Sequence, residues 1–180
     1  MSVFTHAGPD GAKNAAAYVA ATFEILGDRD PLEVLEELSA VLAEATSGLD
    51  LEQLQRPEAP GKWSIVELLR HLADNEVIWA YRVRVVVAED EPTIPAYDQD
   101  LWFSRLGYGQ SDFEESLTLI RVVRSSTCRL LRSLTPEQWR RTGHHVERGR
   151  QDLDQIVRLQ AGHDLVHRRQ LERISRSLGA

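Results

Sequence analysis

Helix-capping signals followed by apolar residues at helical spacing recur along this sequence, and they limit the chain to a helical fold. Asp30 can cap a helix that begins with proline at position 31, and an acid follows two residues later. Leucines then predict a helix from residue 30 to about residue 48 with one buried face: Leu32, Leu35, Leu38 and Leu42. Because the alternating pattern of strands is nearly absent, the sequence predicts an all-α protein.

Three further long helices and one shorter helix carry the same signals. A capping box begins a helix at residues 64–88, which is apolar around most of its circumference and is therefore predicted to be central. Residues 111–134 and 152–178 predict the other two long helices, each beginning with a capping residue. Residues 15–26 predict the shorter helix, which is ended by a glycine.

The connections between these helices decide the architecture. Residues 89–109 are rich in proline, glycine and aromatic residues, too irregular for one helix and too long for a simple turn, and such loops are often functional. Residues 140–151 form a charged connection. Four main helices joined by one or two long connections fit a four-helix bundle, in which side chains from facing helices build cofactor sites.

Length, charge and cysteine content exclude several classes of protein. The 180 residues suit one domain, and a formal net charge of -7 would repel a phosphate backbone, so we expect no nucleic-acid partner. No secretory leader and no charge-free run of spanning length is recognisable, so we expect a cytoplasmic protein without a membrane partner. Cys128 has no second cysteine to pair with and is predicted to be a small core residue.

Two histidines of the last helix share its buried face. His163 and His167 are four residues apart and, at 100° per residue, lie about 40° from each other, within the apolar stripe of this helix. Two imidazoles at this spacing can hold one metal ion, and His71 of the otherwise apolar central helix is the candidate third ligand. The alternatives are a hydrogen-bonded core histidine at position 71 and a solvated pair on the last helix. The other three histidines are predicted to lie on the surface: His6, His144 and His145.

Two long segments resemble a known family. They are GKWSIVELLRHLADNEVIWAYRVRVVVAEDEPTIPAYDQDLW from Gly61 and GHDLVHRRQLERI from Gly162. Together they resemble the DinB-like superfamily and, within it, the YfiT-type metal-dependent hydrolases and bacillithiol S-transferases. The resemblance covers residues 61–174, and the first sixty residues match only loosely.

The resemblance implies a fold and a ligand set. It implies an up-down-down-up four-helix bundle with a long connection after the second main helix, often as a homodimer. The chain would be a single DinB-like domain over residues 1–180, with an extension at 1–29 and the bundle at 30–180. The metal ligands of the family correspond to His71, His163 and His167, which would hold one divalent ion, Zn²⁺ or alternatively Ni²⁺.

Three nitrogen ligands leave a tetrahedral ion with one open position, which is typical of catalytic sites. A water there would supply a metal-bound hydroxide for hydrolysis, whereas a thiol would be held as the nucleophilic thiolate. The resemblance to the S-transferases of the family implies the second case, a metal-dependent thiol S-transferase that joins a bacillithiol-like thiol to a small electrophilic substrate. The alternatives are a metal-dependent hydrolase and a non-catalytic metal-binding bundle.

Two further residues are candidates for catalysis. Arg82 lies eleven residues after His71, on nearly the same helix face, and could bind a carboxylate such as that of bacillithiol or another acidic thiol; alternatively it is a surface arginine paired with an acid such as Glu89. Glu67, one turn before His71, is a candidate base that would lie next to the metal ligands without binding the metal itself. The loop at residues 92–98, with Trp102 and Tyr108 beyond it, is a candidate wall of the substrate pocket: its sequence is PTIPAYD.

Overall fold

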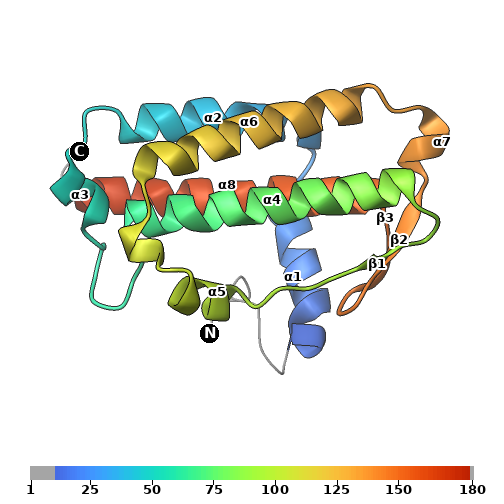
Figure 1. Cartoon of the computed structure of the whole chain (residues 1–180), viewed down its shortest axis with the longest axis horizontal. Coiled ribbons are helices and arrows are strands. Elements are labelled where there is room, and N and C mark those ends of the chain that lie inside the picture. Colours follow the sequence, from blue (N-terminus) through green and yellow to red (C-terminus); the bar gives the residue numbers. More distant parts are fainter. Residues whose placement is uncertain (1–10, 179–180) are drawn as a thin grey trace.

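Four long helices lie side by side in the computed structural model, which describes residues 11–178 (Figure 1). They are α2 (Pro31–Thr46), α4 (Ile65–Ala88), α6 (Phe113–Arg132) and α8 (Leu153–Ser177). Helices α2 and α8 run in one direction and α4 and α6 in the other, which confirms the predicted up-down-down-up bundle (Figure 1). Both α4 and α2 pack against α6 and α8, so α2 and α4 are diagonal neighbours.

The helices begin where the capping residues predicted. The Asp30 side chain accepts the backbone N–H groups of the first turn of α2, and Ser64 and Glu67 form a reciprocal capping box at the start of α4. Asp112 is the residue that caps α6, and Asp152 forms a capping box at the start of α8. Each main helix therefore has its orphan N–H groups satisfied by a side chain that is visible in the sequence.

The connection after α4 returns along the whole length of the bundle (Figure 1). It contains the short strand β1 (Thr93–Ile94), the helix α5 (Gln99–Arg105) and a single 3-10 turn, η1 (Tyr108–Gln110). This return is necessary because α4 and α6 run in the same direction. The predicted long connection is confirmed, and it lies along the open side of α4.

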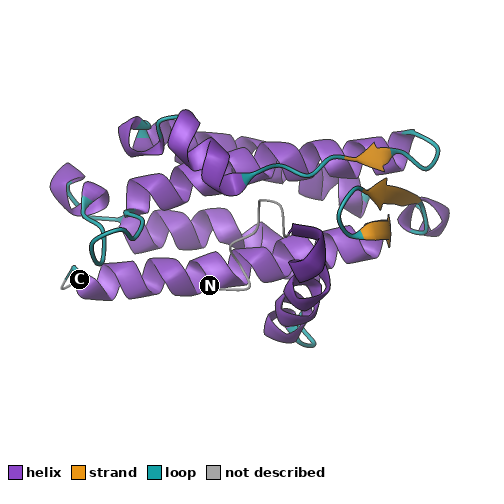
Figure 2. Ribbon diagram, turned by 90° about the horizontal axis from the view of Figure 1, so that it is seen from below, coloured by secondary structure: helices purple, strands orange, loops and turns teal. Residues whose placement is uncertain are grey.

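The charged connection after α6 is more regular than predicted. After the short helix α7 (Pro136–Trp139), strands β2 (Thr142–His145) and β3 (Gly149–Asp152) form an antiparallel hairpin, and β1 pairs parallel to β2. Figure 2 shows this small sheet at one end of the bundle. The sequence predicted a charged connection here and no strands, because the strands carry few apolar residues and the partner strand comes from a distant loop.

Helix α1 (Gly11–Leu26) lies outside the four-helix core and crosses α8 steeply (Figure 1). The crossing is close at Gly162, where an added Cβ would lie 2.3 Å from Thr22 Cγ2 and 2.4 Å from Thr22 O. Only glycine leaves room for the α1 backbone at this position. A shorter helix, α3 (Leu51–Gln55), connects α2 to α4.

A polar layer divides the core of the bundle into two apolar clusters. On α4 the first cluster ends at Ala73 and the second begins at Trp79, while on α8 the boundary falls between Leu165 and Leu171. Cys128 is buried in the core, as predicted. The layer between the clusters contains buried polar side chains from three helices: His71, Asn75, Glu76, Arg124, Asp164 and His167. Among the helices of residues 11–178, none is long and apolar enough to cross a membrane.

Candidate metal centre

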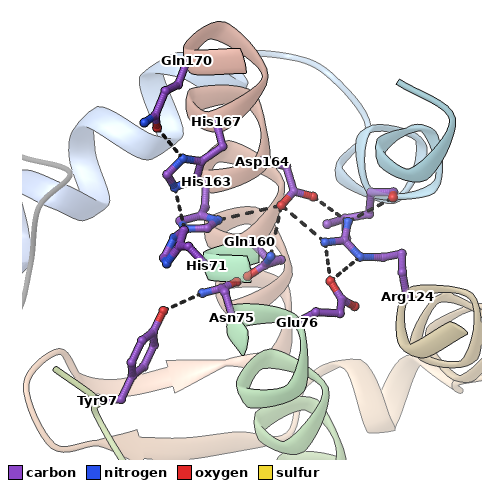
Figure 3. A network of polar contacts seen from close by, with 11 residues as sticks. His71, Asn75, Glu76, Tyr97, Arg124, Gln160, His163, Asp164, His167 and Gln170 are labelled. Carbon is purple, nitrogen blue, oxygen red and sulfur yellow. Dashed lines mark hydrogen bonds and ion pairs between the residues drawn. The ribbon is translucent and has the colours of Figure 1, made fainter. Parts of the chain in front are cut away.

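Three histidine side chains converge within the polar layer. His71 projects from α4, and His163 and His167 project from successive turns of α8 (Figure 3). Nε2 of His163 lies 3.3 Å from Nε2 of His71 and 3.1 Å from Nε2 of His167. The structure therefore brings together the three residues that the helical spacing and the family resemblance selected.

The spacing of the three nitrogens fits one divalent ion. A tetrahedral ion with metal–nitrogen bonds of about 2.0–2.1 Å places its ligand nitrogens about 3.3 Å apart. The two Nε2 distances match this separation, and ligand atoms of all three residues lie within 4.8 Å of one another. Within residues 11–178, no other histidine, cysteine or acid belongs to the group. The donor set thus leaves a fourth position without a protein ligand.

Burial keeps the imidazoles in the form that binds metal. Burial lowers the pKa of His71 well below its ordinary value, and the neighbouring histidines lower it further. Burial, followed by the charge of His163, lowers the pKa of His167 to about 3. Both rings are therefore neutral at physiological pH, and each can offer a nitrogen lone pair to a cation.

Hydrogen bonds orient the ring of His167. Its Nδ1–H donates to Oε1 of Gln170 at 2.9 Å, which leaves Nε2 unprotonated and directed at the other two histidines. Nδ1 of His163 lies 3.8 Å from Oδ1 of Asp164. Nδ1 of His71 is buried without a hydrogen-bond partner. Two of the three rings therefore have a polar neighbour behind the nitrogen that faces away from the cluster.

A buried ionic network lies behind His163 and links three helices (Figure 3). Arg124 of α6 donates to Glu76 of α4 at 2.6 Å and 2.8 Å and to Asp164 of α8. Gln160 donates a further hydrogen bond to Asp164 at 3.1 Å. Burial alone would raise the pKa of Asp164, but the charge of Arg124 lowers it, so this carboxylate is ionised beside His163.

Two cavities of different size adjoin the histidines. A cavity of about 440 Å³ adjoins His167 and Trp63. A small polar cavity of about 70 Å³ adjoins His163 on the other side, and Gln99 of α5 lines both. His163 is the partly exposed member of the cluster, with 11% of its side chain accessible. The histidine site is therefore open towards the small cavity, which His163 lines.

Of the two other predicted site residues, Arg82 lines a cavity beside the histidines, whereas Glu67 lines neither of the two cavities. Oε2 of Glu67 accepts the backbone N–H of Ser64 at 2.8 Å as part of the capping box. Arg82 lines the small cavity, and its Nη2 donates to the carbonyl oxygen of Pro95 at 2.8 Å. Within the described chain, Arg82 makes no ion pair with Glu89, so the surface pairing considered from the sequence is not formed.

The predicted aromatic wall is present in part. Tyr97 lines the small cavity, as the loop prediction required. Trp102 packs on Tyr97 with ring centroids 4.9 Å apart, whereas Tyr108 is buried and packs edge-on against Phe103. Trp63 lies directly beside the histidines, with its ring centroid 5.1 Å from that of His71.

The prediction that His145 lies on the surface was wrong. Its side chain is fully buried, and Nδ1 accepts the backbone N–H groups of Glu147 and Arg148 at 3.1 Å and 3.3 Å. The neighbouring His144 is exposed, as predicted, and His6 lies outside the described residues. His145 therefore organises the turn between β2 and β3, a role that depends on the unpredicted hairpin.

Three other residues around the small cavity were not selected from the sequence: Tyr18, Gln99 and Arg148. They come from α1, from the start of α5 and from the hairpin turn. None lies at helical spacing from a histidine, so local pattern gave no signal for them. Only the packing of α1, the return loop and the hairpin around α4 and α8 brings these side chains together.

The protein is thus a four-helix bundle whose central layer presents three convergent histidines with one side open. The chain matches the family model of the DinB superfamily over residues 34–171. The chain belongs to the DinB superfamily, as the sequence motifs indicated.

Named relatives align with this chain over most of its length. A protein of Oceanobacillus iheyensis named "putative metal-dependent hydrolase" is 30% identical over 74% of this chain and 77% of its own. YfiT of Bacillus subtilis, with the same description, is 28% identical over 82% of this chain and 84% of its own. A solved structure of YfiT, described as "a probable metal-dependent hydrolase with an unusual four-helix bundle topology", superposes with a TM-score of 0.76 and covers 83% of this chain and 86% of that one.

Proposed function

We propose that the protein is a metal-dependent enzyme that transfers a low-molecular-weight thiol to an electrophilic small molecule. His71, His163 and His167 would hold the ion, Zn²⁺ in the first place and Ni²⁺ as the alternative. The observation that carries the proposal is the convergence of three histidine side chains, with two Nε2–Nε2 distances that fit a tetrahedral ion, beside two cavities. The resemblance to S-transferases of the same superfamily supports the choice of a thiol.

A bound divalent ion would act as a Lewis acid and lower the pKa of a thiol or water that occupies its open position. The protein's own part is to orient the imidazoles and to limit access of water. Gln170 fixes the tautomer of His167, and Trp63 covers the ring of His71. Because the site lies in the middle of the bundle, reactants can approach mainly through the two adjoining cavities.

The two cavities support a reaction of two substrates. The cavity of about 440 Å³ beside His167 has the size of an ordinary small-molecule site and would receive one organic reactant. The polar cavity beside His163 would receive part of the other. A hydrolase needs a site for only one organic substrate, so this arrangement favours transfer.

Glu67 remains a candidate base in this proposal. Its Oε2 is engaged by the backbone of Ser64, so Oε1 is the atom that would take a proton. Glu67→Gln separates the two roles because glutamine also closes a capping box. We expect turnover to fall by about 100-fold or more while the melting temperature stays unchanged, since a lost base affects only the chemistry. Unchanged turnover would remove Glu67 from the mechanism.

The transfer reaction can be tested directly. Metal-loaded protein would be incubated with monochlorobimane and with bacillithiol, mycothiol or glutathione, and formation of the fluorescent adduct measured. We expect turnover with at least one thiol, and none above background for a His163→Ala, His167→Ala variant. Equal rates for the two proteins with every thiol would overturn the proposal.

A metal-dependent hydrolase is the second candidate, and the names of the two relatives favour it. In that case the same metal-loaded protein would cleave ester or amide substrates without any thiol, and addition of a thiol would not accelerate product formation. Inactivity in both assays, with metal bound, would leave the third hypothesis, a metal-binding bundle without catalysis.

The homodimer and the cytoplasmic location also belong to this proposal. Exposed apolar side chains of α4 and α6 support an interface between two copies: Val77, Tyr81 and Val122. Light scattering on the purified full-length chain should give twice the mass of one chain. A monomeric mass at high protein concentration would contradict the dimer.

A further inference from the structure

Two arginines from distant elements face the same small polar space beside the histidines. Arg82 comes from α4, and Arg148 comes from the turn between β2 and β3. Both line the cavity of about 70 Å³ next to His163, and both line an adjoining cavity of about 40 Å³. Asn75 and Tyr18 also line both cavities. The two guanidinium groups therefore share one partly enclosed, polar environment.

Neither arginine has an ion-pair partner among the described residues. Nη2 of Arg82 donates to the carbonyl oxygen of Pro95, and its Nε is buried without a hydrogen-bond partner. Nε of Arg148 donates to Oε1 of Gln151 at 3.1 Å. Glu147 is the acid that lines the cavity, but it forms no ion pair with either guanidinium. Donors therefore remain available for a ligand.

The charges of the two arginines are only partly compensated in this space. Burial, followed by repulsion from Arg148, lowers the pKa of Arg82 to about 10, and burial also lowers the pKa of Arg148, while the nearby charge of Glu147 opposes both shifts. Both groups stay protonated at neutral pH. Keeping two like charges partly buried without a directly paired carboxylate among the described residues is unfavourable, and a bound anion would relieve this repulsion.

The turn that carries Arg148 is held in one conformation. The buried His145 accepts two backbone N–H groups of the turn, and Gly149 takes the left-handed conformation, with φ of 73°, that ends a three-residue hairpin loop. On the opposite side, the ring of Tyr97 lies 5.9 Å from the guanidinium carbon of Arg82. The two cationic groups are thus positioned before any ligand arrives, which reduces the entropy lost on binding.

The size of the cavity limits what can bind there. About 70 Å³ is several times the 10–15 Å³ that one water needs, enough for a carboxylate group but not for a bulky molecule. A planar carboxylate also matches the fork of donors on arginine. The rest of a ligand would have to extend towards His163.

We propose that Arg82 and Arg148 form a carboxylate-binding subsite, so that one substrate carries a carboxylate close to the group that reacts at the histidine cluster. This inference rests on the proposed function for the identity of the reacting group, but the binding of a carboxylate does not. It assigns Arg148, a residue of the hairpin turn, to substrate recognition.

The test is the binding of propionate to the full-length, metal-loaded protein, measured by saturation-transfer NMR, with the neutral isostere propionamide as the comparison ligand. We expect propionate to bind with a dissociation constant in the millimolar range, about that of one charged anchor. Arg82→Gln and Arg148→Gln should each weaken binding by about tenfold or more, because a charge-assisted pair is lost. Arg105→Gln, at an exposed arginine of α5, is the matched control and should leave binding unchanged.

Each possible result decides between the alternatives. Propionate that still binds both glutamine variants, but not the His163→Ala, His167→Ala variant, would be a ligand of the metal, and the subsite would be refuted. Equal binding of propionamide, or no binding of propionate to the wild type, would refute it as well. If the Arg148→Gln variant fails to fold, Arg148→Lys is the substitute, because lysine keeps the charge but lacks the paired donors of the guanidinium group. This variant should bind propionate with intermediate affinity.

The subsite and the proposed function can fail separately. A protein that turns over thiol and electrophile but does not bind propionate contradicts the subsite alone. A protein that binds propionate through both arginines but shows no thiol-dependent turnover contradicts the transfer reaction alone.

Discussion

The buried histidine side chains of this protein have two different roles. His71, His163 and His167 direct their Nε2 atoms at one point, whereas His145 directs Nδ1 at backbone N–H groups of its own turn. The first arrangement was predictable because helical spacing places His163 and His167 on one face and makes His71 an exception on an apolar helix. The second was not predictable, since it depends on a hairpin that has no clear signal in the sequence.

The buried imidazole of His145 should make stability depend on pH. Burial lowers its pKa to about 3, so the folded state binds fewer protons than the unfolded state between that pH and about 6.5. The contribution of the neutral His145 to the free energy of unfolding is therefore complete above about pH 6.5 and is lost as the pH falls. The expected loss between pH 7 and pH 5 is about 2 kcal/mol.

His145→Asn tests this prediction because the asparagine oxygen can still accept the N–H groups of the turn. Urea unfolding at pH 7, 6 and 5 should show a smaller loss of stability for this variant than for the wild type. His144→Asn, at the exposed neighbouring position, should behave like the wild type. An identical loss in His145→Asn and the wild type would show that His145 does not contribute to the pH dependence.

Between helices, the polar layer depends on Arg124. This residue joins Glu76 of α4 and Asp164 of α8, with only 3% of its side chain exposed. Arg124→Met would leave two buried carboxylates without a counter-charge, and removing one partner of such a network destabilises a protein by about 3–5 kcal/mol. We therefore expect a much lower midpoint in urea unfolding.

Arg132→Met is the matched control for this prediction. Arg132 lies on the same helix and also bonds a carboxylate, that of Glu36, but half of its side chain is exposed. Its replacement should change the urea midpoint little, because exposed ion pairs contribute little to stability. Similar losses in Arg124→Met and Arg132→Met would contradict the importance assigned to the buried network.

The crossing of α1 over α8 depends on Gly162. A Cβ here would meet the backbone and side chain of Thr22 at less than 3 Å, so Gly162→Ala should displace α1 and destabilise the protein by about 1–3 kcal/mol. Hydrogen exchange of residues 11–26 should become faster. Gly109→Ala, where the added Cβ makes only ordinary contacts, is the control. Unchanged exchange in Gly162→Ala would mean that α1 does not require this close approach.

The sequence predicted the helices well and the strands poorly, for a physical reason. Caps such as Asp30 and Asp152 act within one helical turn, so their effect can be seen locally. Strand β2 packs so closely against Ile94 and Val86 at Gly143 that an added Cβ would be 2.8 Å from Cδ1 of Ile94. That contact joins segments about fifty residues apart in the chain, and no local pattern reports it.

For the molecule as a whole, the bundle topology and the position of the histidines were both predicted, but the surroundings of the site were not. The resemblance to the DinB superfamily indicated the bundle and the three histidines, and the family model matches residues 34–171. The small cavity arises where α1, the return loop and the hairpin meet the bundle, and the larger one where α1, the start of α5 and the connection before α4 meet α8. Both therefore depend on how distant elements pack, which local motifs do not specify. The division of residues 1–180 into an extension and a bundle stays a prediction, although α1 already packs on α8.

The three convergent histidines should hold a metal ion, and the metal content of the purified full-length protein measures this. Elemental analysis should find about one divalent ion per chain in the wild type and in His144→Ala, the control at an exposed histidine, because three nitrogen ligands suffice for tight binding. The His163→Ala, His167→Ala variant, with a single ligand left, should retain almost none. A folded double variant that kept the metal content of the wild type would contradict this account.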